Sequence, residues 1–192
     1  MLKSRLAIEG LEIIKPTNHS DERGFFSEIW KDESGFPEFK QMNMSVSKLC
    51  TFRGLHYQWD RPQGKMIRVV KGSAIFFELD VRSYSPTFGE HEVIPLNGKT
   101  NEWLWVPAGF ANGFFTLEED THVMYMCTEK WSKCEGSINH NILGYDFNML
   151  GSIRNISEKD SNAPSFDESI AHLESISDFF RNDSKGVIEI NA

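Results

Sequence analysis

Short segments rich in β-branched and aromatic residues, separated by turn signals, are the feature that most constrains the fold of this chain. They include residues 65–71 (KMIRVVK), 74–81 (AIFFELDV), 102–106 (EWLWV) and 122–128 (HVMYMCT). Such residues favour strands because their side chains pack well on a pleated surface. Short strands at regular intervals, without helices between them, predict a β-sandwich or a small β-barrel.

Two pairs of segments flank short turn signals, and each pair is predicted to form a hairpin. Gly72-Ser73 separates the first two segments, and the acidic tip Glu118-Glu119-Asp120 separates residues 114–117 from residues 122–128. Within the last segment, strand alternation places Tyr125 on the same face as its apolar second neighbours.

A single helix is predicted near the C-terminus. Residues 165–168 (SFDE) have the form of a capping box, in which Ser165 and Glu168 bond to free N–H groups at a helix start. Apolar residues then recur at helical spacing, at Ile170, Leu173, Ile176, Phe179 and Phe180. This helix is expected to pack outside the barrel, with docking of a partner as the alternative. The polar tail, residues 181–192, is expected to be mobile.

Length and composition narrow the class of protein. The chain has 192 residues, 40% of them hydrophobic, which suits one domain with a core plus a short appendage. Its net charge of −8 provides no basic surplus for nucleic-acid binding. No apolar run approaches the roughly 20 residues that cross a membrane, and residues 1–10 lack a signal-peptide core. Cys50, Cys127 and Cys134 have no CxxC spacing and indicate reduced thiols of a cytoplasmic protein.

Polar residues gather in three clusters. The first, residues 21–28 (DERGFFSE), is either a turn with ordinary surface charges or a place where Arg23 holds an anion by bidentate hydrogen bonds. The third, residues 107–114 (PAGFANGF), reads mainly as a glycine-rich turn, although Asn112 could face a pocket.

The second cluster comprises residues 41–45 (QMNMS), 53–58 (RGLHYQ) and 63–65 (QGK). On a regular strand His56 would face away from Arg53, unless Gly54 introduces a bulge. A lone histidine in apolar surroundings is more often structural than catalytic. This one lies among Arg, Gln, Asn and Lys side chains, which are expensive to bury without a ligand, and that favours a functional site.

A metal site is disfavoured by the sequence. Such a site needs three or four His or carboxylate ligands in one place. There is no HxH pair, and the other histidines stand in unrelated segments, at His19, His91, His122, His140 and His172. The nucleophile-elbow, phosphate-loop and dinucleotide-binding motifs are also missing from the sequence.

Taken together and in order, these motifs resemble the dTDP-4-dehydrorhamnose 3,5-epimerase family. The matching segments are DERGFFSE (21–28), QMNMSVS (41–47), RGLHYQ (53–58), QGKMIRVVKG (63–72), DVRSYSPTFG (80–89), VPAGFANGF (106–114), VMYMCTEKW (123–131) and SEKD (157–160). The resemblance implies an all-β, cupin-type jelly-roll barrel with a few peripheral helices, including a C-terminal helix. It implies one epimerase domain over residues 1–192, with the barrel at about 11–150 and a helical appendage at about 151–192.

The resemblance also implies roles for individual residues. His56 is expected to be the general base, Asp160 its carboxylate partner, Tyr125 the acid on the opposite face, and Lys65 the cation near the C4 oxygen. Nucleotide, phosphate and sugar contacts are expected from a larger set: Arg23, Glu28, Gln41, Asn43, Arg53, Asn112, Glu135 and Lys159. The spacing at Glu135 departs from the family by about one residue. No metal and no nicotinamide are implied, and the usual assembly is a homodimer with exchanged strands.

Two departures from the family pattern concern the sugar. The family usually has His where this chain has Asn112, and a second Tyr where it has Trp131. The expected function is inversion of C3, C5 or both in a nucleotide-diphosphate-linked 4-keto-6-deoxy sugar, in the family's usual setting of surface-polysaccharide synthesis. The alternatives are a cupin-type 3,4-ketoisomerase and a non-catalytic sugar-nucleotide binder.

Overall fold

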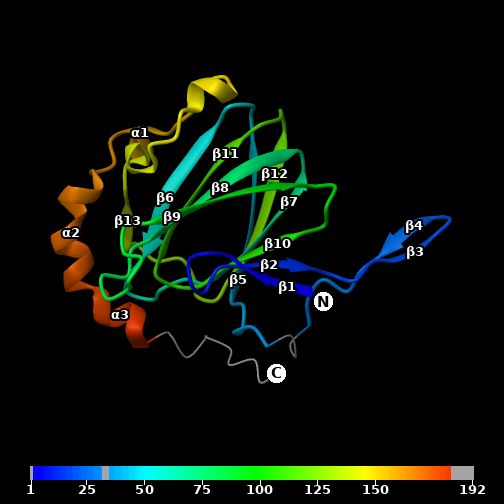
Figure 1. The fold of residues 1–192 in the computed structure, drawn as a ribbon, viewed down its shortest axis with the longest axis horizontal. Helices are drawn as coiled ribbons and strands as arrows, with labels where there is room; N and C mark the ends of the chain where they lie inside the picture. Colours follow the sequence, from blue (N-terminus) through cyan, green and yellow to red (C-terminus); the bar gives the residue numbers. More distant parts are fainter. Residues whose placement is uncertain (1, 32–34, 183–192) are drawn as a thin grey trace.

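Two facing β-sheets dominate the computed structural model, which describes residues 2–31 and 35–182 (Figure 1). The first sheet has the order β1 (Leu2–Arg5), β2 (Glu12–Lys15), β10 (Trp103–Val106), β7 (Lys65–Lys71), β12 (Thr121–Cys127) and β5 (Gln41–Ser47). The second has the order β13 (Glu135–Ser137), β6 (Phe52–Gln58), β11 (Phe110–Thr116), β8 (Ser73–Asp80) and β9 (His91–Asn97). This is the predicted all-β, jelly-roll architecture, and the prediction of the fold class is confirmed.

Both predicted hairpins are wrong, because the chain changes sheet at each turn. β7 pairs with β10 and β12, whereas β8 pairs with β11 and β9. β11 and β12 likewise lie in different sheets. The turns are adjacent: a Cβ on Gly72, whose φ is +81°, would lie 2.5 Å from Oγ1 of Thr121. A glycine with positive φ is compatible with a hairpin turn and with a turn that crosses from one sheet to the other. The local sequence therefore does not distinguish the two.

The space between the sheets is filled by apolar side chains of both. They include Ile67 and Val69 from β7, Phe76 from β8, Phe114 from β11 and Val123 from β12. β8 is buried on both faces, since Ile75, Phe77 and Leu79 belong to a second cluster on its outer side. A strand buried on both faces explains why its sequence is a continuous apolar run instead of an alternating one.

Helices cover the outer face of the second sheet (Figure 1). They are η1 (His140–Leu143), η2 (Phe147–Leu150), α1 (Glu158–Ser161), α2 (Phe166–Ser175) and α3 (Ser177–Asn182). Ser165 and Glu168 form the predicted capping box at the start of α2. The predicted helix is confirmed but divides in two at Ile176, and Leu173, Ile176 and Phe180 pack into the cluster on the sheet. The first two residues of the predicted polar tail, residues 181–192, belong to α3, and residues 183–192 lie outside the described residues.

A bulge in β6 turns two polar side chains to the same side of the sheet. Gly54 has a φ of +119°, and the register with β11 shifts between Asn112–His56 and Phe114–Arg53. Arg53 and His56 therefore both face the interior, while Leu55 packs into the outer cluster. A Cβ on Gly54 would lie 2.5 Å from Cα of Gly113, so this close approach of two backbones requires glycine.

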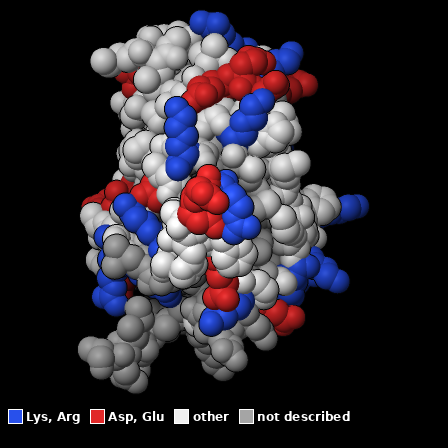
Figure 2. All heavy atoms as spheres, turned by 90° about the vertical axis from the view of Figure 1, so that its right-hand side faces the viewer, with Lys and Arg blue, Asp and Glu red and all other residues white. Residues whose placement is uncertain are grey.

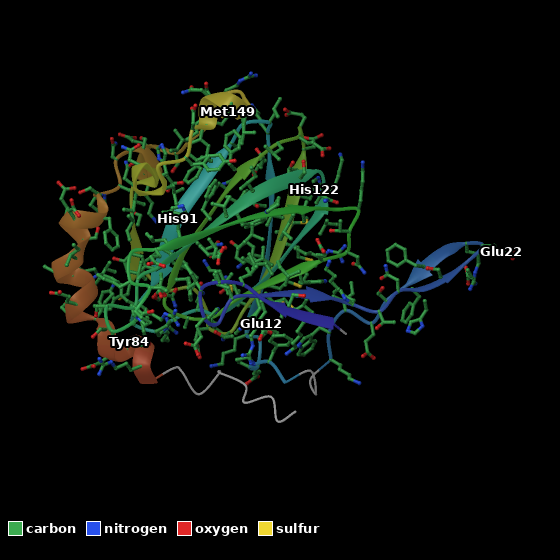
Figure 3. The ribbon with its side chains drawn as sticks, in the orientation of Figure 1. Glu12, Glu22, Tyr84, His91, His122 and Met149 are labelled. Carbon is green, nitrogen blue, oxygen red and sulfur yellow. The ribbon has the colours of Figure 1, made fainter. Side chains whose placement is uncertain are left out.

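A two-stranded arm projects from the body of the molecule. It consists of β3 (His19–Asp21) and β4 (Gly24–Phe26), which pair with each other, and its residues are exposed. Glu22 lies at its tip, far from the barrel (Figures 1 and 3). Among the described residues, no helix is long and apolar enough to cross a membrane.

Candidate active site

A cavity of about 1050 Å³ opens between the two sheets. The first sheet contributes side chains from β5, β7 and β12, and the second contributes them from β13, β6, β11 and β8. The segment that contains α1 closes one side. Of the residues expected in the site, the cavity is lined by Gln41, Asn43, Arg53, His56, Lys65, Asn112, Tyr125, Glu135, Lys159 and Asp160. Segments far apart in the chain therefore meet at one place, as the motifs predict.

His56 and Asp160 form a hydrogen-bonded pair at the cavity wall. Nε2 of His56 lies 2.7 Å from Oδ1 of Asp160, whose Oδ2 accepts a hydrogen bond from the Gly54 N–H at 3.2 Å. The Asp160 N–H in turn donates to Oγ of Ser157, the N-cap of α1, at 3.1 Å. Asp160 is 3% exposed, so the carboxyl group is held rigidly between α1 and β6.

The environment of Asp160 fixes the tautomer of His56. Burial alone would raise the pKa of Asp160, but the hydrogen bond and positive charge of His56, with the Gly54 N–H and Ser157, outweigh it and lower that pKa. The carboxylate accepts and does not donate, so Nε2 of His56 carries the proton. The lone pair of a neutral His56 is then on Nδ1, the nitrogen not bonded to Asp160.

Tyr125 and Lys65 line the cavity from the first sheet, across from His56. Tyr125 lies opposite Asn43 and Ile67 in the ladder, and Lys65 lies opposite Cys127. Burial first, and then the charges of Cys127 and Glu135, raise the pKa of Tyr125 despite the attraction of Arg53. Tyr125 is therefore protonated at neutral pH and can donate a proton from the sheet that faces His56.

Other predicted binding residues form polar contacts along the cavity. Gln41 Nε2 donates to Asn43 Oδ1 at 3.0 Å, and Gln41 Oε1 accepts from the Trp131 N–H at 2.8 Å. Arg53 Nε donates to Ser47 Oγ at 3.0 Å, which leaves its Nη groups for an anion. Trp131, which departs from the family pattern, also lines the cavity and is 54% exposed.

Lys159 and Glu135, which are both expected to contact the substrate, form an ion pair with each other at the cavity wall. Two further cations, Lys48 and Arg154, also line the cavity and were not predicted. The cavity of this acidic chain therefore carries more positively charged side chains than the sequence motifs predicted.

Arg23 and Glu28 are not brought to this cavity by the fold of their own chain. Arg23 lies in the turn of the arm, where its Nη2 contacts Oδ2 of Asp21 at 2.6 Å and its side chain is 85% exposed. Glu28 lies 3.6 Å from Nζ of Lys31 and is exposed. On the side of the molecule that carries the arm, acidic and basic side chains are intermixed with uncharged ones (Figure 2).

Glu78 is a functional candidate that the motifs do not indicate. It projects from β8 into the barrel interior, is 0% exposed, and accepts a hydrogen bond from Nδ2 of Asn112. Burial raises its pKa well above the ordinary value, against the attraction of Lys65 and the Asn112 hydrogen bond. The available signal was a single acidic residue in the apolar run AIFFELDV, in step with Ala74 and Phe76.

Within residues 2–31 and 35–182, no three His, Cys, Asp or Glu side chains are arranged to hold a metal ion. The histidines other than His56 lie apart from one another. His91, for example, is on β9 and His122 is on β12, in different sheets (Figure 3).

A sequence profile of the dTDP-4-dehydrorhamnose 3,5-epimerase family matches residues 5–168. The chain belongs to this family. The enzyme of that name from Salmonella typhimurium is 35% identical over 181 residues, which cover 88% of this chain and 98% of the relative. The predictions of the family and of an isomerase are thereby confirmed.

Solved structures of relatives show the same architecture. The dTDP-6-deoxy-D-glucose-3,5-epimerase of Legionella pneumophila, in complex with dTDP-4-keto-L-rhamnose, has a TM-score of 0.83 and 32% identity, covering 90% of this chain and 96% of that one. A 3'-monoepimerase from Streptomyces bikiniensis, in complex with dTDP-quinovose, has a TM-score of 0.79 and 29% identity, with coverage of 94% and 96%. The chain is thus similar both to double and to single epimerases.

Proposed function

We propose that this protein inverts C3, C5 or both in a nucleotide-diphosphate-linked 4-keto-6-deoxy sugar. The observation that carries the proposal is the position of His56 and Tyr125 on facing sheets of one cavity, with Asp160 bonded to His56. A sugar ring between the sheets loses a proton to one side and regains one from the other. Such a cycle inverts a carbon and is redox-neutral.

The proposed base is Nδ1 of His56. A C–H beside a ketone is acidic only because the resulting anion spreads onto the carbonyl oxygen, so the reaction needs a placed base and a stabilised enolate. Asp160 stabilises the imidazolium that forms, and Lys65 supplies positive charge to the developing oxyanion. Tyr125 then delivers a proton to the opposite face.

The nucleotide diphosphate is proposed to bind along the basic part of the cavity. Arg53 is suited to a phosphate because its planar Nη groups can form two parallel hydrogen bonds. Lys159 lies on the same cavity, and Gln41 and Asn43 offer amide groups for the nucleoside. Binding energy from these remote contacts orients the sugar for proton transfer.

We also infer a homodimer in which the arms are exchanged. The edge strand β5 exposes Met42 (61%), Met44 (62%) and Val46 (48%) on one face, an apolar row that water does not favour. The arm adds Phe25 (57%) and Phe26 (71%) to the exposed apolar surface. A second copy would cover these residues, and its arm would bring Arg23 and Glu28 toward this cavity.

The two other functions fit the residues less well. A 3,4-ketoisomerase moves a carbonyl along one edge of the ring, so an acid placed across the cavity from the base is not needed for it. A non-catalytic binder does not need the His56–Asp160 pair. The three cysteines are free, two of them buried, which supports a reducing compartment such as the cytoplasm.

The decisive experiment is incubation with dTDP-4-keto-6-deoxyglucose in D₂O, followed by NMR. Deuterium at C3 and C5 with inversion at both identifies a double epimerase, and deuterium at one carbon identifies a single epimerase. A migrated carbonyl would favour the ketoisomerase. If no carbon exchanges with any of several nucleotide-linked 4-keto sugars, the catalytic proposal is wrong. His56→Ala should abolish exchange in a folded protein, and full exchange would remove His56 from its role.

A further inference from the structure

Glu78 is a fully buried carboxylic acid that the proton transfers described above do not use. Its Oε1 accepts the hydrogen bond from Nδ2 of Asn112, and its Oε2 has no hydrogen-bond partner. A buried polar atom without a partner costs free energy, so a carboxyl group at this position is unfavourable for the barrel itself. An apolar side chain there would match its interior neighbours on β8, Ala74 and Phe76, which belong to the core between the sheets.

The position of Glu78 relates it to the base. His56, Asn112 and Glu78 occupy directly opposed positions on β6, β11 and β8, so they form a row across the second sheet. His56 and Asn112 line the cavity, and Glu78 lies behind Asn112. Anything that fixes the Asn112 side chain therefore acts on the wall immediately beside His56.

The contact decides which end of the Asn112 amide meets a ligand. An asparagine side chain has a donor end, Nδ2, and an acceptor end, Oδ1, and rotation by half a turn exchanges them. Glu78 holds the donor end, so the acceptor end is directed away from β8. Burial raises the pKa of Glu78 well above its ordinary value, and the carbonyl oxygen of a neutral acid still accepts that hydrogen bond.

We propose that Glu78 is a positioning residue that directs the side-chain carbonyl of Asn112 toward the bound sugar, where it accepts a hydrogen bond from a ring hydroxyl. This inference rests on the proposed function. A 4-keto-6-deoxyhexose linked through C1 has ring hydroxyls at C2 and C3 only, whereas C5 carries a methyl group. An acceptor beside His56 therefore orients the C3 side of the ring toward the base, and the Glu78–Asn112 pair favours proton exchange at C3.

The test compares binding of dTDP with binding of dTDP-glucose by calorimetry, which does not require turnover. Glu78→Leu should leave the affinity for dTDP within about twofold and weaken that for dTDP-glucose about 3- to 10-fold, the value of one neutral hydrogen bond. In an Asn112→Ala background the same substitution should have no further effect. Equal losses for the two ligands, no loss for either, or the same loss in both backgrounds would overturn the inference.

Two further measurements separate positioning from a structural role. Because Glu78→Leu removes an unpaired buried oxygen, the variant should unfold at the same temperature as wild type or higher while it loses sugar affinity. Glu78→Gln is isosteric and still offers a carbonyl oxygen to Nδ2 of Asn112, so it should retain more of the sugar affinity than Glu78→Leu does. If Glu78→Leu does not fold, Glu78→Ala takes its place, and an Ala variant that keeps full affinity for dTDP-glucose overturns the inference.

The exchange assay gives a readout specific to the ring position. In D₂O, Glu78→Leu should lower deuterium incorporation at C3 more than at C5, and equal losses at the two carbons would contradict the proposed orientation. The control is the wild-type protein. If the wild-type protein binds neither dTDP nor dTDP-glucose and exchanges no proton, the proposed function fails and this inference fails with it. If the wild-type protein binds both ligands and the Glu78 variants bind them equally well, only this inference fails.

Discussion

His56 donates a hydrogen bond from Nε2 to Oδ1 of Asp160 over 2.7 Å, and the same carboxylate accepts a second one from the Gly54 N–H. Gly54 is the residue whose positive φ turns His56 into the cavity. One buried carboxylate therefore holds both the imidazole and the backbone bulge that presents it. This arrangement leaves Nδ1 of His56 as the only ring nitrogen free to take a proton.

Asp160→Asn should lower the rate of C–H exchange by up to about 10⁴-fold, the loss found when the analogous carboxylate of a hydrolase triad is replaced by Asn. The amide can donate to Nε2, which favours the tautomer protonated on Nδ1 and removes the base. The rate is measured by NMR in D₂O, with Glu158→Gln, on the exposed side of the same helix, as the control. If Asp160→Asn keeps more than a tenth of the wild-type rate, Asp160 does not set the tautomer.

Tyr125→Phe should separate exchange from inversion. His56 can still remove a proton and return a deuteron to the same face, so solvent deuterium should enter with the original configuration. Inversion should fall about 10²-fold or more, the usual contribution of a positioned general acid. NMR reports both quantities in one sample.

Tyr57→Phe is the matched control for that experiment. Tyr57 belongs to the outer cluster on β6, and burial raises its pKa to about 12. The Tyr57→Phe variant should incorporate deuterium and invert the sugar carbon at the wild-type rates. If Tyr125→Phe loses exchange and inversion in equal proportion, Tyr125 contributes to proton removal as well, and the assignment of one role to each sheet is wrong.

The motifs predicted the residues that line the cavity better than the path of the chain that brings them there. A motif records which side chains a site needs, so RGLHYQ and SEKD indicated His56 and Asp160 although they are 104 residues apart. The path depends on which sheet a strand joins. At Gly72, Thr121 packs against the glycine, a contact between distant segments that no local pattern records.

Glu78 shows a second limit of prediction from sequence. A carboxylate within an apolar run can be a surface residue, a buried ion pair or a neutral acid, and the sequence alone does not choose among them. The choice follows from residues on other strands, here Asn112 on the neighbouring β11 and the more distant charge of Lys65 on β7 of the facing sheet. Arg23 is the opposite case, since its motif is clear but its own chain leaves it on the arm.

Mixed dimers should reveal whether the arms are exchanged. Arg23→Ala should weaken substrate binding, and His56→Ala should abolish exchange, so each homodimer is impaired. If Arg23 acts in the partner's cavity, a heterodimer of the two variants has one site with both residues intact. Mixing and refolding should then restore about a quarter of wild-type activity, because half of the randomly formed dimers are heterodimers with one such site each.

That experiment has two clear contrary outcomes. If Arg23 serves its own chain, no site in the heterodimer has both residues, and mixing should give only the average of the two variants. A protein that sediments as a monomer at assay concentration would also contradict the exchanged dimer. Lys99→Ala, at an exposed position between β9 and β10 and outside the arm's two strands and the cavity lining, is the control for loss of surface charge.

The pH dependence of stability should change when Glu78 is replaced by Gln. Burial raises the pKa of Glu78 above its ordinary value of 4.5, so between 4.5 and the folded-state pKa the native protein binds this proton and the unfolded chain does not. Because the native state binds more protons there, the free energy of unfolding falls as pH rises, by up to about 1.4 kcal/mol per pH unit for one proton. Glu78→Gln removes this dependence, so its stability relative to wild type should increase from pH 5 to pH 8.

Urea unfolding at these two pH values measures the difference, with Glu158→Gln as the exposed control. A relative stability that stays constant or decreases would mean that Glu78 is ionised in the folded protein.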